Sequence, residues 1–190
     1  MKITSVLKGA IAGSVLIALG TGNSLAQVCE ETQFTAKNYE VYAKAETELL
    51  VNDNAQAAQT FFNELMTLDL NCYERNAAIR LGAGVKIKIG DFRGAAADFE
   101  AMLRSGVIPA SERTKTLFDI SQMYLNADDQ IKALSYLDQW VNAGGSPDRT
   151  TKWQMAVLNY QQDKNSEALR WAEQVFRQDG PNAERQVYDF

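Results

Sequence analysis

The chain carries an internal repeat, and this repeat constrains the fold more than any other feature. A turn sequence is followed by a small residue at Ala95, Ala133 and Ala168, which are 38 and 35 positions apart. A weaker copy places Ala57 38 positions before Ala95. Self-similarity with a period in the thirties is typical of stacked helical hairpins. The repeat therefore predicts an all-α protein built from about four such hairpins.

Each copy has the pattern of a helix, a short turn and a second helix. The turns are expected at Asn52-Asp53, Gly90-Asp91, Asp128-Asp129 and Asp163-Lys164. Apolar residues at helical spacing lie on both sides of the turns, for example in 117–125 and 133–141. A small residue lets the two helices of a hairpin approach closely, and the residue four positions later lies on the same face. These later residues are Phe61, Phe99, Leu137 and Ala172.

Helix-breaking residues divide the chain between hairpins. Pro109, the run 144–147 and Gly180-Pro181 fall just past the expected second helices, and Ser111 or Ser146 would cap the next helix. We expect the repeating units to begin near Asn38, Asn76, Thr114 and Arg149. The repeats then occupy residues 38–182, after a lead at 27–37 and before a tail at 183–190. The tail is interpreted as a lid on the last hairpin, with a frayed helix end or a docking segment as alternatives.

Residues 1–26 have the pattern of a cleaved secretory signal. Lys2 and Lys8 give the start of the chain a positive charge, and an apolar stretch follows over 10–19. Ser24-Leu25-Ala26 then forms a cleavage site. A membrane-spanning helix needs roughly 20 apolar residues, more than this stretch contains. A lipid anchor is not expected, because it requires a cysteine immediately after the cleavage site and Gln27 and Val28 precede Cys29. We therefore expect an exported protein with no membrane span after cleavage.

The two cysteines, Cys29 and Cys72, both lie in the exported part, where disulfides persist. We expect them to pair and to hold the lead against the first hairpin, a constraint of about 4 kcal/mol on the unfolded chain. The alternative is two unpaired thiols. The formal net charge of −5 argues against nucleic acid as a partner, because nucleic-acid binding requires clusters of Lys and Arg.

Catalysis is not expected from this composition. The chain contains no histidine, which removes the commonest general base and the histidine metal sites. It also lacks a Gly-rich phosphate loop and a nucleophile elbow. The acidic pairs Asp128-Asp129 and Glu30-Glu31 suggest a metal site as an alternative, but aspartates in turns most often cap a helix. No metal, cofactor or enzymatic activity is therefore predicted.

The repeated residues resemble the tetratricopeptide repeat. The match comprises Ala83, Gly90, Asp91, Phe92, Ala95 and Phe99 in one unit, Ser121, Tyr124, Asp128, Ala133, Leu137 and Pro147 in the next, and Ala156, Asp163, Ala168 and Pro181 in the last. Gln130 and Asn165 depart from it where the family has an aromatic residue in the turn. The resemblance implies a right-handed solenoid of about four hairpins.

The segments 111–124 and 132–140, together with Cys72-Tyr73-Glu74-Arg75, look like periplasmic tetratricopeptide proteins encoded beside TonB, ExbB and ExbD. This likeness covers about 38–178. It implies a periplasmic adaptor or scaffold that binds TonB, ExbB, ExbD or an outer-membrane receptor and assists uptake. Two alternatives are a periplasmic chaperone or outer-membrane assembly helper that binds unfolded segments, and self-association of the solenoid ends.

First helices of a solenoid line its concave wall, which commonly binds partners. The expected register places Tyr39, Tyr42, Leu49, Arg80, Lys88, Lys115, Phe118, Gln122, Trp153, Val157 and Tyr160 on that wall. Aromatic residues supply apolar contact area, and the cations would hold carboxylates of a peptide. For Phe118 and Trp153 core packing is the competing interpretation, and Tyr39 and Tyr42 could pack against the lead.

Overall fold

The protein is all-α in the computed structural model, which describes residues 29–180. Within this range the helices are α1 (Ala36–Leu50), α2 (Ala55–Leu65), α3 (Cys72–Lys88), α4 (Phe92–Ser105), α5 (Ala110–Asn126), α6 (Gln130–Asn142), α7 (Arg149–Gln161) and α8 (Asn165–Asp179). The all-α prediction is confirmed. The signal predicted at 1–26 and the tail at 183–190 lie outside the described residues.

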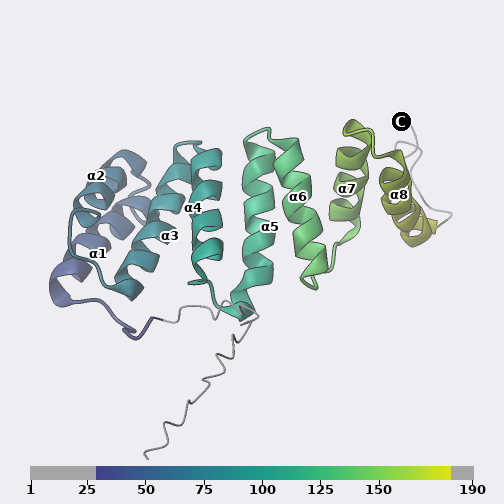
Figure 1. Cartoon of the computed structure of the whole chain (residues 1–190). Coiled ribbons are helices and arrows are strands. Elements are labelled where there is room, and N and C mark those ends of the chain that lie inside the picture. Colours follow the sequence, from purple (N-terminus) through teal and green to yellow (C-terminus); the bar gives the residue numbers. More distant parts are fainter. Residues whose placement is uncertain (1–28, 181–190) are drawn as a thin grey trace, which may run out of the picture.

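The helices form successive hairpins that stand side by side in chain order (Figure 1). The two helices of each hairpin, α1–α2, α3–α4, α5–α6 and α7–α8, pack on each other. Contacts of α4 with α5 and of α6 with α7 join neighbouring hairpins, and α3 touches both α1 and α2. Among the described residues, no helix has both the length and the apolar character needed to cross a membrane.

The turn inside each hairpin has one repeated conformation. Asp53, Gly90, Asp128 and Asp163 have positive φ angles of 51°, 83°, 55° and 58°. Glycine, and to a lesser degree aspartate, tolerates this left-handed region. In the first three turns the next residue caps the second helix, and the Asp91 carboxylate accepts a hydrogen bond from the Gly94 amide at 2.9 Å. The acidic turn residues therefore have a structural role in ending one helix and starting the next.

Buried small residues allow the helices of each hairpin to cross closely. Ala95 and Ala133 are fully buried, and Ala168 is 5% exposed. In the first hairpin the predicted residue was wrong, because Ala58 is fully buried whereas Ala57 is only half-buried. The reason is a turn longer by one residue, since Ala45 precedes Ala58 by 13 positions and the corresponding Ala83 precedes Ala95 by 12.

The helices begin at residues that differ from several predicted starts. Helix α1 begins after Thr35 and α3 after Asn71, which forms a capping box with Glu74. These caps lie a few residues before the expected unit boundaries. The predicted serine caps were wrong, because α5 begins after Pro109 and α7 after Asp148, whose carboxylate accepts from the Thr151 amide at 2.7 Å. A carboxylate caps a helix at least as well as a hydroxyl, so Asp148 takes this role.

Candidate binding groove along helix α3

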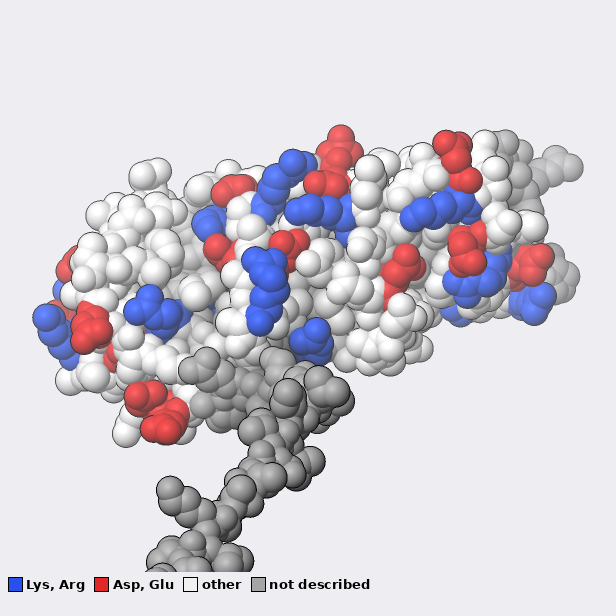
Figure 2. Space-filling view, viewed as in Figure 1, with Lys and Arg blue, Asp and Glu red and all other residues white. Residues whose placement is uncertain are grey.

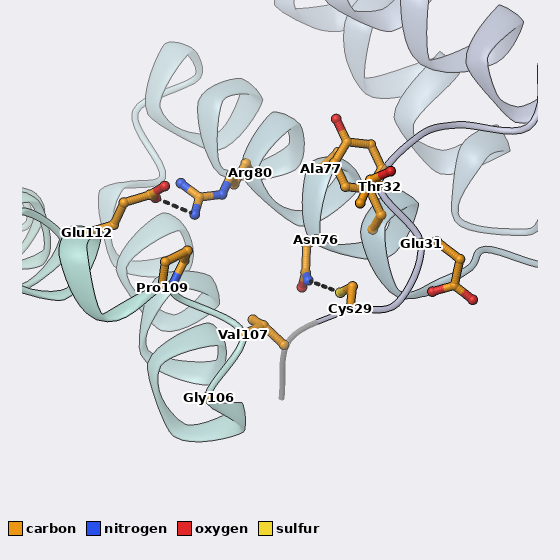
Figure 3. Close-up of a pocket in the computed structure, with 11 residues that line it drawn as sticks. Cys29, Glu31, Thr32, Asn76, Ala77, Arg80, Gly106, Val107, Pro109 and Glu112 are labelled. Atoms are coloured by element: carbon orange, nitrogen blue, oxygen red, sulfur yellow. Dashed lines mark hydrogen bonds and ion pairs between the residues drawn. The ribbon is translucent and has the colours of Figure 1, made fainter. Parts of the chain in front are cut away.

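Two adjoining hollows lie along one face of α3. The first, here called the lead cavity, has a volume of about 550 Å³ and is lined by Cys29, Glu31 and Thr32 of the lead, Tyr73, Asn76, Ala77 and Arg80 of α3, and Gly106, Val107, Pro109 and Glu112 at the α4–α5 junction. Figure 3 shows these lead residues and the α4–α5 loop on opposite sides of the α3 side chains.

The second hollow, here called the α3–α5 hollow, has a volume of about 420 Å³. It is lined by Arg80, Gly84 and Ile87 of α3, Phe92 and Phe99 of α4, and Asp119, Gln122, Met123 and Asn126 of α5. Arg80 borders both hollows. The two together are called the α3 groove.

Helical spacing explains why α3 presents this stripe. Tyr73, Ala77, Arg80, Gly84 and Ile87 recur every three or four residues and so share one face of the helix. The residues on the other side, Ala78, Leu81 and Val85, are buried in the core. The core therefore fixes the rotation of α3 about its axis, and that rotation turns the stripe toward the hollows.

The fully buried carboxylate of Glu74 holds the lead against α3. Its Oε1 accepts hydrogen bonds from the amide and hydroxyl of Thr35 at 2.7 and 2.8 Å. Its Oε2 accepts from the Asn38 side chain at 2.8 Å and from the Asn71 amide at 2.9 Å. Burial acts to raise the pKa of Glu74, but these hydrogen bonds outweigh it and the pKa lies below its ordinary value. The carboxylate is therefore charged and fully hydrogen-bonded at neutral pH.

The disulfide between Cys29 and Cys72 fixes the beginning of the described lead, which confirms the predicted pairing. The Asn76 side chain donates to Cys29 Sγ at 3.2 Å (Figure 3). Phe34 in the same segment packs against Tyr42 and Tyr73, with ring centroids 4.6 and 5.5 Å apart. These contacts hold the lead as one wall of the lead cavity.

Phe34 also explains the positions of the two predicted groove tyrosines on α1. The Tyr39 ring centroid lies 5.9 Å from that of Phe34, and Tyr42 is closer still. Burial, followed by the charge of Glu46, raises the pKa of Tyr42 to about 12. Both tyrosines therefore pack against the lead, and neither lines the α3 groove.

Each of the three predicted groove cations has a carboxylate partner. Arg80 pairs with Glu112 at 2.8 Å, Lys88 pairs with Asp53, and Lys115 pairs with Asp119. Arg80 lines both hollows, whereas Lys88 and Lys115 line neither. Because these charges are already neutralised, the groove does not present free cations for an anionic ligand.

The remaining predicted groove residues lie in different places. Gln122 lines the α3–α5 hollow, so it joins Arg80 there. Leu49 is buried in the core. Phe118 and Trp153 are half-buried and pack against the core between α6, α7 and α8, with the Phe118 ring 4.8 Å from Trp140. Val157 is half-buried and Tyr160 is 52% exposed on α7, outside both hollows.

The sequence did not indicate that the lead and the α4–α5 junction form walls of a cavity. Glu31, Thr32, Val107 and Pro109 carry no repeated pattern that would mark them. The one useful clue was the expected bridge of Cys29 to Cys72, which places the lead beside α3.

A cluster of ionisable groups lies outside the groove, between α4, α5 and α6. Glu100 accepts from the Tyr124 hydroxyl at 2.6 Å, and Lys132 donates to the same hydroxyl at 2.9 Å. Burial acts to raise the pKa of Glu100, but the hydrogen bond from Tyr124 and the charge of Lys132 lower it below its ordinary value. Burial, with the Glu100 charge next, raises the pKa of Tyr136 to about 12. These groups keep their ordinary charge states at neutral pH, which suits a structural link between hairpins.

Positive and negative side chains are interspersed on the face shown in Figure 2, and no patch of one sign dominates it. This face therefore shows no continuous stripe of Lys and Arg among the described residues. Comparisons with protein-family models, with curated proteins and with solved structures find no match for this chain.

Proposed function

We propose that this protein is a non-catalytic, periplasmic, tetratricopeptide-like right-handed solenoid that binds a segment of a protein partner in the α3 groove. We further propose that it acts as an adaptor for a TonB-dependent outer-membrane transport system. The observation that carries the binding proposal is the stripe on α3 that lines two adjoining hollows, with Arg80 between them. Concave sites that combine apolar walls with a few polar groups are typical binding sites.

The chemistry of the groove favours an extended segment with apolar side chains. Ala77, Val107 and Ile87 supply apolar wall, while the amides of Asn76 and Gln122 can donate to and accept from a peptide backbone. Because Arg80 is neutralised by Glu112, an acidic ligand would first have to displace that carboxylate. We therefore expect apolar side chains of the partner to supply most of the affinity.

The periplasmic location is supported by the disulfide between Cys29 and Cys72, since disulfides persist in oxidising compartments. The TonB link depends on the sequence resemblance alone. The apolar character of the groove favours one alternative, a chaperone or outer-membrane assembly helper that binds unfolded segments.

Site-specific photo-crosslinking in the native envelope tests the groove. A photoreactive amino acid at position 87, in the α3–α5 hollow, is compared with one at position 97, where Ala97 is exposed on α4 outside both hollows. We expect a crosslinked partner only from position 87. Equal crosslinking from both positions would refute the groove as the binding site.

A second variant fills the lead cavity. Ala77→Phe places a ring in the cavity and should abolish the crosslink from position 87, whereas the matched variant Ala97→Phe should leave it unchanged. Both variants must keep the helical circular-dichroism spectrum. Recovery of TonB, ExbB, ExbD or one receptor would support the adaptor, and a broad set of unfolded proteins would support the chaperone.

A further inference from the structure

The outer face of α1 is the uncovered end of the row of hairpins among the described residues (Figure 1). Helix α1 turns Val41, Ala45 and Leu49 toward the core. Its opposite face carries a shallow hollow of about 620 Å³ with Phe61 of α2 at its side, and the α1 residues that line it are Ala36, Tyr39, Glu40, Ala43, Lys44, Thr47 and Glu48. We call the α1 part of this surface the α1 end face.

The opposite end of the row differs in character. The outer face of α8 carries ion pairs between Arg170 and Glu167 at 2.7 Å and between Arg177 and Glu173 at 3.2 Å. A polar outer face of this kind is what a terminal repeat needs for solubility. The centre of the α1 end face has small and apolar residues instead, and Tyr39 is 55% and Leu50 69% exposed. The α1 end face therefore combines charged side chains, among them the Glu40–Lys44 ion pair, with a centre of small and apolar residues.

The charges along one flank of the α1 end face are complementary to the same charges on a second, antiparallel α1. The sequence places Lys37, Glu40, Lys44 and Glu48 along that flank, so the signs alternate from positive to negative. If a second α1 lies antiparallel and is centred between Tyr42 and Ala43, Lys37 of each copy lies near Glu48 of the other, and Glu40 lies near Lys44. A parallel twofold pair would instead place this flank against the other flank of the second copy, so these charges would not pair.

Small side chains at the centre of the face fit the same arrangement. Ala36, Ala43 and Thr47 would allow two helices to approach closely, as small residues do inside each hairpin of this protein. Tyr39 and Leu50 lie on the other flank, where they would supply apolar area. Opposite ends of the two helices would meet, as an isologous interface with a twofold axis requires.

We propose that the α1 end face binds a second copy of this chain, in a twofold dimer whose α1 helices lie antiparallel and cross near Ala43. Within one helix, Glu40 and Lys44 form an exposed ion pair at 3.0 Å. In the dimer, Glu40 of each copy would also pair with Lys44 of the other. The proposed surface shares no residue with the hollows of the α3 groove, so dimerisation and partner binding can be tested separately.

Sedimentation velocity of the purified protein from about 1 to about 200 µM tests the proposal. We expect a reversible monomer–dimer equilibrium. Lys44→Glu should raise the dimer dissociation constant by about tenfold, because each charge reversal acts twice in a twofold interface. The double variant Glu40→Lys with Lys44→Glu should return it to within about threefold of the original, because the complementary pairs are restored with reversed signs.

A third variant tests the centre of the face. Ala43→Glu places two like charges at the twofold axis and should leave the protein monomeric, with an unchanged helical circular-dichroism spectrum because Ala43 lies on the side of α1 away from the core. A monomer at every concentration in the original protein would overturn the proposal. So would a dimer that is insensitive to Ala43→Glu, or a double charge swap that fails to restore association.

Discussion

Replacing Glu74 by glutamine should destabilise the protein far more than its small change in shape suggests. Each carboxylate oxygen accepts two hydrogen bonds, from Thr35 on one side and from Asn38 and Asn71 on the other. A glutamine with its NH₂ group toward Thr35 can donate to the Thr35 hydroxyl, which then acts as an acceptor, but the Thr35 amide is left without an acceptor. With this one buried unsatisfied donor costing about 2 kcal/mol, Glu74→Gln should lower the free energy of unfolding by about 2 kcal/mol.

The measurement is chemical denaturation at pH 7 followed by circular dichroism at the helical band. The same loss should lower the melting temperature by about 6 °C in a domain of this size. Glu173→Gln is the matched control, because the ion pair of Glu173 with Arg177 is exposed and its loss should change stability by less than about 0.5 kcal/mol. A loss below about 1 kcal/mol for Glu74→Gln would refute the idea that this carboxylate anchors the lead.

The pH dependence provides an independent check on the same residue. Because folding lowers the pKa of Glu74, the charged carboxylate stabilises the folded state fully above its ordinary pKa. That contribution is lost as the pH falls through the lowered, folded-state pKa. The difference in stability between the original protein and Glu74→Gln should therefore shrink steadily below about pH 4. A difference that stays constant down to the acid transition would contradict the assigned charge state.

Three further changes should have effects of predictable size. Cys29→Ser with Cys72→Ser should cost about 4 kcal/mol in denaturant unfolding under oxidising conditions, and a reductant should weaken the original protein but not the variant. Tyr124→Phe removes the hydroxyl that donates to Glu100 and accepts from Lys132, and it should lower the free energy of unfolding by about 2 kcal/mol in the same assay. An unchanged free energy of unfolding would show that the cluster adds nothing to stability. Ala133→Leu overfills a fully buried helix crossing and should lower the melting temperature by about 6 °C, and an unchanged value would indicate a looser crossing than the structure has.

The helices and their turns were predictable from local sequence. A period in the thirties, helical spacing of apolar residues and turn residues such as Gly90 and Asp128 determine where helices form and end, because capping and backbone conformation involve only neighbouring residues. The cysteine pair was predictable for a different reason, since Cys29 had a single possible intramolecular partner in Cys72. The buried alanine of the first hairpin was not predictable in this way. One additional residue in its turn places Ala58, and not Ala57, at the helix crossing.

The groove and its electrostatics depended on contacts between distant parts of the chain. Arg80 was predicted to be available for a ligand, but Glu112, 32 positions away, neutralises it. The wall formed by Glu31 and Thr32 exists because the carboxylate of Glu74 and a disulfide bring the lead onto α3. The sequence by itself determined the all-α hairpins, since their hydrogen bonds and caps are local. Only the tertiary structure decided which faces meet and which charges pair, because those energies depend on distances that the order of residues does not set.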